Sequence, residues 1–271
     1  MKTAVAAAAV VLAAGVSHAQ QFEATPRPPG EVSRDYLRGD EVNYRDVMGP
    51  PPKQGSLLDR VDVEQVESFQ KTVSPERYAE ALADAEYLWP RFSPALGVTI
   101  DRAHLPKTIQ LLYGAARDAA LVSSAGKTGW GRIRPYQRLQ LQRVCGFETA
   151  PRPQDNDPGD RTSYPSGHTT EGWTTGLVLA QIAPARKAAL LDKSREYGLS
   201  RVICAAHWPT DVEAGRAAAT AVFERLMATP AFRRDLECAR AEYQRLAGVV
   251  DDTPAVCVAE PAARSGRRAR G

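Results

Sequence analysis

The chain has 271 residues with a formal net charge of +3, and 43% of its residues are hydrophobic, which suffices for one folded domain with a buried core. Much of the basic excess lies in the tail from Arg264 to Arg270. Because a nucleic-acid-binding surface needs Lys and Arg clustered along a folded face, this distribution argues against a nucleic-acid partner.

The N-terminal residues resemble a targeting segment. Lys2 is followed by an Ala- and Val-rich run over 4–16 and then by Ser17-His18-Ala19, a pattern typical of a signal peptide spanning 1–19. The run is shorter than the about 20 residues that a membrane helix needs, and no later stretch comes closer. We therefore expect no membrane span and a mature protein that starts near Gln20 and is periplasmic or secreted.

Residues 20–56 are rich in Pro, Gly and charge and show no sustained period, which predicts an irregular N-terminal arm over the domain surface. Helical signals follow. Ser74-Pro75 is typical of an N-cap and a first helical position, so we expect a helix from there to Trp89. Residues 105–122 predict a second amphipathic helix that ends before Ser123.

The second half of the chain repeats this helical pattern. Residues 151–160 combine prolines with Asp and Asn and predict a loop. No alternating strand pattern appears, so we predict an all-α fold, with one compact helical catalytic domain over 57–250 and a flexible tail over 251–271. The later predicted helices cover 169–191 with an interruption at Pro184, then 194–206, 211–227 and 230–246.

Four cysteines in an oxidising compartment can pair in three ways, and the sequence does not choose among them. We prefer Cys145 with Cys204, which would brace two functional segments, and Cys238 with Cys257, which would hold the tail. The alternative is that some of the four remain free thiols.

His207 and Asp211 are four residues apart near a predicted helix start. If the local turn is helical, Asp211 accepts the Nδ1 proton of His207 and leaves Nε2 with a free lone pair. A neutral, oriented imidazole is a nucleophile, and the carboxylate stabilises the positive charge that develops during attack. Pro209 precludes a helix interior, so we place His207 on the turn before a helix starting near Thr210. Alone, the pair is more typical of a surface contact.

His168 follows Ser166-Gly167 and precedes a helical pattern. The N–H groups of such a turn and the helix N-terminus form an anion site, and Gly167 allows close backbone approach. An imidazolium at His168 would donate a proton to a leaving oxygen. Because an unperturbed imidazole titrates near pH ~6.5, this role predicts activity on the acid side. Alone, Pro-Ser-Gly is an ordinary turn.

Lys127, Arg134 and Arg201 are candidate cations for the same site, with Arg132 a weaker fourth. A phosphoryl transition state spreads negative charge over its equatorial oxygens, and forked guanidinium donors match that geometry. A single basic residue is usually solvated surface. The joint occurrence of these cations with both histidines is what indicates phosphoryl transfer.

These segments together resemble the three signature motifs of the type 2 phosphatidic acid phosphatase superfamily. Within it, residues 163–169 resemble the signature of bacterial class A non-specific acid phosphatases, with Thr162 standing where that signature usually has glycine. The three motifs are Lys127, six residues and Arg134-Pro135; Pro165-Ser166-Gly167-His168; and Ser200-Arg201, five residues, His207, three residues and Asp211.

The resemblance implies an all-helical core shared with vanadium haloperoxidases and a broad phosphate monoesterase. His207 would become phosphohistidine, Asp211 would orient it, and His168 would protonate the leaving alcohol of a small-molecule phosphomonoester. No metal or other cofactor is implied, and His104 has no ligand grouping beside it in the sequence. The phosphate oxygens would be held by Lys127, Arg134, Ser166, Gly167 and Arg201.

Three alternatives remain open. In a vanadium-dependent haloperoxidase the same residues would bind vanadate. A lipid or diphosphate phosphatase would share the site, although such relatives usually carry several membrane spans. A non-enzymatic phosphate-binding protein would not need both histidines and Asp211. The substrate preference, a phosphotransferase activity and the oligomeric state, a homo-oligomer included, stay undetermined.

Overall fold

The computed structural model describes residues 35–139 apart from Tyr87, then 141, 143–145, 161–249, 254 and 257. Its elements are helical, and no strand occurs in these ranges, which confirms the all-α prediction. The predicted signal peptide, the loop over 151–160 and most of the tail lie outside the described residues. The elements are α1 (Tyr44–Val47), α2 (Leu57–Thr72), α3 (Pro75–Glu86), η2 (Trp89–Phe92), α4 (Ser93–Leu96), α5 (Pro106–Trp130), α6 (Pro135–Leu139), α7 (Gly167–Ile182), η4 (Pro184–Arg186), α8 (Lys187–Ile203), α9 (Pro209–Ala228) and α10 (Pro230–Leu246).

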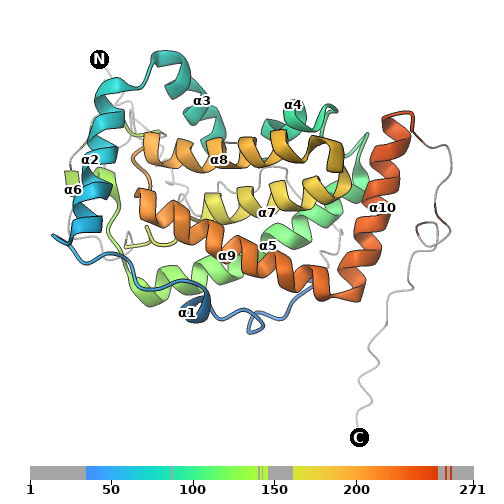
Figure 1. Ribbon diagram of the computed structural model, residues 1–271, viewed down its shortest axis with the longest axis horizontal. Coiled ribbons are helices and arrows are strands. Elements are labelled where there is room, and N and C mark those ends of the chain that lie inside the picture. The colour runs from blue at the N-terminus through green and yellow to red at the C-terminus, as the bar shows by residue number, and fades with distance from the viewer. Residues whose placement is uncertain are drawn as a thin grey trace, which may run out of the picture.

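Helix α7 lies in the middle of the bundle, between α8 and α9, with α5 behind it (Figure 1). Helix α10 crosses one end, while α2 and α6 lie at the other (Figure 1). Glycine on α7 allows neighbouring helices to pack close to it. A Cβ atom at Gly176 would lie 1.8 Å from the Ser194 hydroxyl oxygen, so only glycine lets α8 pack this closely. Among the described helices, none is long and apolar enough to cross a bilayer.

Helix α5 is longer than the sequence pattern predicted. The predicted end before Ser123 is wrong, since the helix continues to Trp130 and carries Lys127 on its last turn. Ser123 is buried and its hydroxyl donates to the carbonyl of Ala120 at 3.0 Å, so it does not compete for a turn. The stop comes at Gly131, whose φ of 64° supplies the left-handed C-cap.

The other helix boundaries differ from the predictions in smaller ways. Helix α3 starts at Pro75 as predicted but ends at Glu86, before the 3₁₀ turn over Trp89–Phe92. Residues 187–203 form one continuous helix, although the pattern had divided them after 191. Helices α9 and α10 begin with proline at their first positions, Pro209 and Pro230.

Part of the N-terminal arm is fastened to α5 by one carboxylate. Oδ2 of Asp118 accepts hydrogen bonds from the backbone N–H groups of Tyr36 and Leu37, both at 3.2 Å. Tyr36 and Leu37 are buried in the main core, so this contact anchors the start of the described chain. Burial raises the pKa of Asp118 from 3.8 to about 7, and the two N–H bonds oppose that rise.

This raised pKa predicts that Asp118→Asn stabilises the protein by an amount that depends on pH. Between the unfolded and folded pKa values the folded protein binds more protons, so the free energy of unfolding falls as pH rises from about 4 to 7. Asparagine keeps an acceptor for both N–H groups and carries no charge. We expect Tm to rise by about 6 °C at pH ~8, and by clearly less at pH ~5, in thermal unfolding followed by circular dichroism. A larger rise in Tm at pH ~5 than at pH ~8 would contradict the raised pKa of Asp118.

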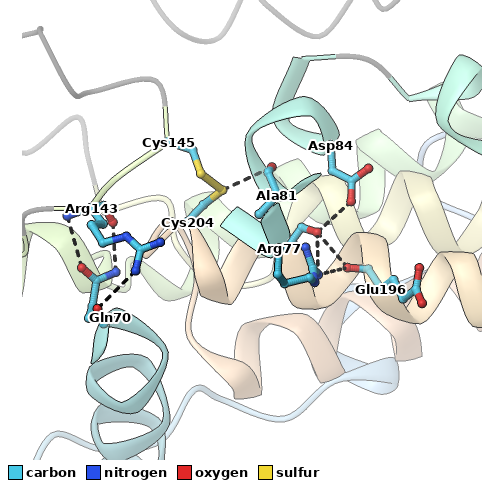
Figure 2. The surroundings of a disulfide bond; sticks show 9 residues. Gln70, Arg77, Ala81, Asp84, Arg143, Cys145, Glu196 and Cys204 are labelled. Carbon is cyan, nitrogen blue, oxygen red and sulfur yellow. Dashed lines mark hydrogen bonds between the residues drawn. A yellow bond between two sulfur atoms is a disulfide. The ribbon is translucent and has the colours of Figure 1, made fainter. Parts of the chain in front are cut away.

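Two disulfides, Cys145–Cys204 and Cys238–Cys257, confirm the preferred pairing. Figure 2 shows the first of them between α2 and α3, where Sγ of Cys204 lies 3.4 Å from the carbonyl oxygen of Ala81. Beside it Arg143 bonds the main chain of Gln70 and the end of α2. The bridge therefore ties the end of α8 to the segment after α6, and both flank the candidate site.

Candidate active site

The three motif segments meet at one end of α7. Backbone hydrogen bonds join them in pairs: Ser166 N–H to the Asp211 carbonyl at 2.9 Å, and Ser163 N–H to the Arg132 carbonyl at 3.0 Å. The predicted site residues are thereby brought to one place from five elements. Lys127 ends α5, Arg134 precedes α6, Ser166, Gly167 and His168 start α7, Arg201 ends α8, and His207 and Asp211 flank the start of α9.

His207 is 2% exposed and held at both ring nitrogens. Nδ1 lies 2.7 Å from the Ser163 carbonyl oxygen, which can only accept, so Nδ1 carries the proton. Nε2 lies 3.2 Å from Nη1 of Arg134, which can only donate, so Nε2 presents its lone pair. Burial, and then the charges of Arg134, Lys127 and Arg201, lower the pKa of His207 well below 6.5. These contacts and the lowered pKa favour a neutral imidazole with its proton on Nδ1 and its lone pair on Nε2.

Asp211 contacts His207 less directly than the spacing predicted. Its Oδ2 lies 3.5 Å from Nδ1 of His207, farther than the Ser163 carbonyl. The buried carboxylate instead accepts from the Ser163 hydroxyl at 2.5 Å and from the Trp208 N–H at 2.8 Å. Ser163 thus serves both partners, since its carbonyl holds His207 and its hydroxyl holds Asp211.

Arg132 is engaged by carboxylates rather than available for a phosphate group. Nη1 donates to Oδ1 of Asp211 at 2.6 Å, and Nη2 donates to Oδ2 of Asp62 at 2.7 Å. The guanidinium carbon also lies 5.2 Å from the centre of the Trp208 ring. The weak prediction of Arg132 as a fourth phosphate ligand is therefore not supported by its contacts.

The turn that leads into His207 is strained. Ala205 has a φ of 54°, which is uncommon for a residue with a Cβ atom. Its carbonyl accepts from the Tyr136 N–H at 3.1 Å, and the N–H groups of Ala206 and His207 both donate to the Arg201 carbonyl. These bonds hold a conformation that aims His207 back toward the start of α7.

Arg201 is a buried cation, and two of its nitrogens have no bonding partner among the described residues. Only 6% exposed, it has an Nε and an Nη1 without a hydrogen-bond partner among the described residues. Burial lowers its pKa from 12.5 to about 10. A buried charge is unfavourable unless an opposite charge accompanies it. Its surroundings therefore suit an anionic ligand.

Lys127 and Arg134 are positioned by main-chain oxygens. Nζ of Lys127 donates to the carbonyls of Thr162 and Pro165, the latter at 2.9 Å. Arg134 donates from Nη1 to the Ala206 carbonyl at 2.8 Å and from Nη2 to the Thr162 hydroxyl at 3.1 Å. Carbonyl and hydroxyl acceptors carry no net charge, so these bonds orient the two cations without cancelling their charge.

His168 lies in the first turn of α7, where the helix dipole favours an anion. Ser166 is the buried N-cap, and its hydroxyl oxygen accepts from the Thr169 N–H at 3.3 Å. Burial, and then the charge of Arg201, lower the pKa of His168 well below 6.5. An anionic phosphoryl group bound beside it would oppose that shift and favour the imidazolium.

The described cations and helix N-terminus suit a phosphoryl group, and comparison with known proteins shows which family the chain resembles. The family model of the PAP2 superfamily matches residues 107–235. An acid phosphatase of Zymomonas mobilis is 31% identical over 239 residues, covering 87% of this chain and 86% of the relative. The chain belongs to the PAP2 superfamily.

Two further relatives indicate which kind of PAP2 enzyme the chain is. A non-specific acid phosphatase of Providencia stuartii is 32% identical over 78% of this chain and 85% of its own, and one of Salmonella typhimurium is 33% identical over 75% and 81%. The chain is thus an acid phosphatase of the PAP2 superfamily, and the resemblance that the motifs indicated is confirmed.

The aromatic residues beside the motifs of this acid phosphatase are mostly structural. Tyr136 and Trp208 are buried in a small core cluster with Val66, and Tyr164 is buried in the main core with its hydroxyl donating to Gly49. Only Trp130 is partly exposed, and it packs edge-on against Tyr44. These contacts make Tyr136, Tyr164 and Trp208 poor candidates for a wall that selects the leaving group.

Sequence reasoning missed three residues around the phosphatase site. Ser163 and Thr162 were noticed only as motif context, although they hold His207, Asp211 and Arg134. Asp62 was not noticed at all. The one available signal was Ser56 followed by Asp59, a typical helix start that places Asp62 one turn farther along α2. His104, by contrast, is exposed beside Asp101 as predicted.

Proposed function

We propose that this acid phosphatase hydrolyses phosphate monoesters of varied alcohols without a metal ion, through a phosphohistidine at His207. The lone pair of Nε2 attacks phosphorus, the ester P–O bond breaks, and its electron pair stays on the alcohol oxygen. His168 supplies the proton that this oxygen takes up. Water then attacks phosphorus, His168 takes back a proton, and the P–N bond breaks to release phosphate.

The observation that carries this proposal is the protonation state of His207. Its Nδ1 faces an obligatory acceptor and its Nε2 faces a cation, so the ring is neutral and ready to attack. Three cations lower its pKa, and the same charges would stabilise the equatorial oxygens of the transition state. In this scheme Lys127, Arg134 and Arg201 bind the phosphate oxygens together with the turn over Ser166 and Gly167. Asp211 orients His207 through Ser163.

The acid preference follows from the same charges. The pKa of His168 is lowered in the described structure, so its proton depends on the phosphoryl group that arrives. We therefore expect turnover to favour acid pH, where His168 gains its proton readily in the substrate complex while His207 remains neutral.

We also propose that the mature enzyme starts near Gln20 and works in the periplasm or outside the cell, with its catalytic domain over 57–250. The signal-peptide pattern over 1–19 supports export. The two disulfides support an oxidising compartment, because cytosolic thiols are kept reduced.

The proposed chemistry is tested by hydrolysis of p-nitrophenyl phosphate at acid and neutral pH in the presence of EDTA, with and without vanadate. We expect acid-side turnover that resists EDTA and is inhibited by vanadate. Loss of turnover in EDTA that a divalent cation restores would contradict the metal-free route. Absence of turnover at every pH, with bromide oxidation after addition of vanadate and peroxide, would instead favour a haloperoxidase.

Thr162 offers a smaller test of the same scheme. Its hydroxyl accepts from Nη2 of Arg134, so Thr162→Val keeps the side-chain shape and removes one bond to a cation that binds substrate. We expect KM for p-nitrophenyl phosphate to rise about 5-fold with kcat within about 2-fold, because the loss affects binding before chemistry. Thr162→Ser retains the hydroxyl and is the matched control. An unchanged KM in the valine variant would contradict this role.

A further inference from the structure

Asp62, on α2, is a buried carboxylate that joins two segments of the active site. Its Oδ1 accepts from the Thr210 N–H at 3.0 Å, in the first turn of α9. Its Oδ2 accepts from the Thr210 hydroxyl at 2.5 Å and from Nη2 of Arg132 at 2.7 Å. The side chain is 1% exposed, so both oxygens are committed to these bonds in a dry environment.

From Asp62 the contacts lead to the nucleophile without a break. Arg132 binds Asp62 with one nitrogen and Asp211 with the other, and Nη1 also donates to the Thr210 hydroxyl at 2.7 Å. Asp211 accepts from the Ser163 hydroxyl, and the Ser163 carbonyl accepts Nδ1–H of His207. Every bond in this chain involves a buried or nearly buried group, so water competes little for these donors and acceptors.

Asp62 differs from the residues that bind substrate in the proposed scheme. No hydrogen bond or ion pair of its described side chain reaches Lys127, Arg134, Arg201 or either catalytic histidine. It also precedes the region over 107–235 that the PAP2 model matches. Its effect on the reaction would therefore pass through the groups that it binds, Arg132 and Thr210.

We propose that Asp62 is a positioning residue of the phosphatase reaction, which fixes Arg132 and the start of α9 so that Asp211 and Ser163 hold His207 in its attacking orientation. This inference rests on the proposed attack by His207. A carboxylate is required because Oδ2 faces two donors at once, the Arg132 guanidinium and the Thr210 hydroxyl.

The test is Asp62→Asn, measured by the rate of phosphoenzyme formation. Asparagine can still accept from the Thr210 N–H, but its amide NH₂ would face the guanidinium, donor against donor. We expect labelling by radiolabelled phenyl phosphate, quenched in alkali, to slow about 10- to 100-fold, since small misplacement of a reacting group has effects of this size. The inhibition constant of inorganic phosphate should change less than about 3-fold, because the proposed phosphate ligands are untouched.

Asp59→Asn is the matched control. Asp59 lies one turn earlier on α2, is equally buried, and forms a two-bond pair with Arg138 at 2.6 and 3.0 Å. Its Oδ1 and Nη2 of Arg132 form a longer ion pair at 3.9 Å, beyond hydrogen-bond distance. We expect Asp59→Asn to lower Tm as much as Asp62→Asn does, because both variants weaken the attachment of α2. The rate of phosphoenzyme labelling in Asp59→Asn should stay near that of the wild type. Equal slowing in both variants would overturn the proposal in favour of a general structural effect.

A double-mutant cycle with Arg132→Gln tests the route. Because Asp62 binds both Arg132 and the start of α9, the two substitutions should slow labelling less than additively. Full additivity would overturn the proposal. Should Asp62→Asn fail to fold, Thr210→Val removes the hydroxyl between Asp62 and Arg132 and should slow labelling by a smaller factor. Wild-type turnover without any labelled protein would refute the phosphohistidine itself, whereas normal labelling in all Asp62 variants would refute only the role of Asp62.

Discussion

His207→Ala should lower kcat for p-nitrophenyl phosphate by roughly 10⁴-fold or more and abolish the labelled phosphoenzyme, because His207 supplies the attacking lone pair in the proposed scheme. His207 is buried, its Nε2 faces the Arg134 guanidinium, and burial together with three nearby cations lowers its pKa. Steady-state kinetics and alkaline-quench labelling measure the two effects.

His104→Ala is the matched control for this loss, since His104 is exposed and pairs only locally with Asp101. It should leave kcat within about 2-fold of the wild type. Free imidazole added to His207→Ala should restore part of the turnover, because the small molecule can occupy the vacated volume and attack in place of the side chain. Full activity in His207→Ala would refute the nucleophile assignment and leave the PAP2 membership intact.

Arg201→Met should weaken phosphate or vanadate binding by about 100-fold or more while stabilising the protein in phosphate-free buffer. The two effects share one cause, a buried guanidinium whose Nε and Nη1 find no acceptor among the described residues. Removing an uncompensated buried charge should raise the free energy of unfolding by about 1–3 kcal/mol. Removing the cation deprives the phosphate oxygens of a forked donor.

Thermal unfolding with and without phosphate separates these effects. Wild-type Tm should rise with phosphate, since a ligand at about 100 times its Kd adds about 2.7 kcal/mol to the unfolding free energy. Arg201→Met should start from a higher Tm and gain nothing from phosphate. Arg138→Met is the control, because it breaks the buried pair with Asp59, lowers Tm and leaves the phosphate response intact. A lower Tm in Arg201→Met with a normal phosphate response would show that Arg201 is a structural cation.

The helices were predictable because their signals are local. Proline at the first position announces α3, α9 and α10, and the spacing of apolar residues continues from those starts. The one large error, the end of α5, arose because Ser123 and its neighbours have weak helix propensity. Packing against α7 and α9 overrides that propensity when the residues are buried.

The residue types of the candidate site could also be predicted from the sequence. Two histidines, one carboxylate and three cations in three spaced segments indicate phosphoryl transfer, and the family comparison supports that class. The roles of the individual residues remain predictions that the variants above test.

What the sequence by itself determined is the fold class, the family and the residue types available for catalysis, since these depend on period, spacing and side-chain chemistry. Only the tertiary structure decided which groups hold the candidate catalytic residues in place. The acceptor for His207 Nδ1 is 44 positions away, Asp62 is 70 positions from Arg132, and Asp62 is 148 positions from Thr210. No local pattern links such distant residues, because their hydrogen bonds form only when helix packing brings them together and excludes water.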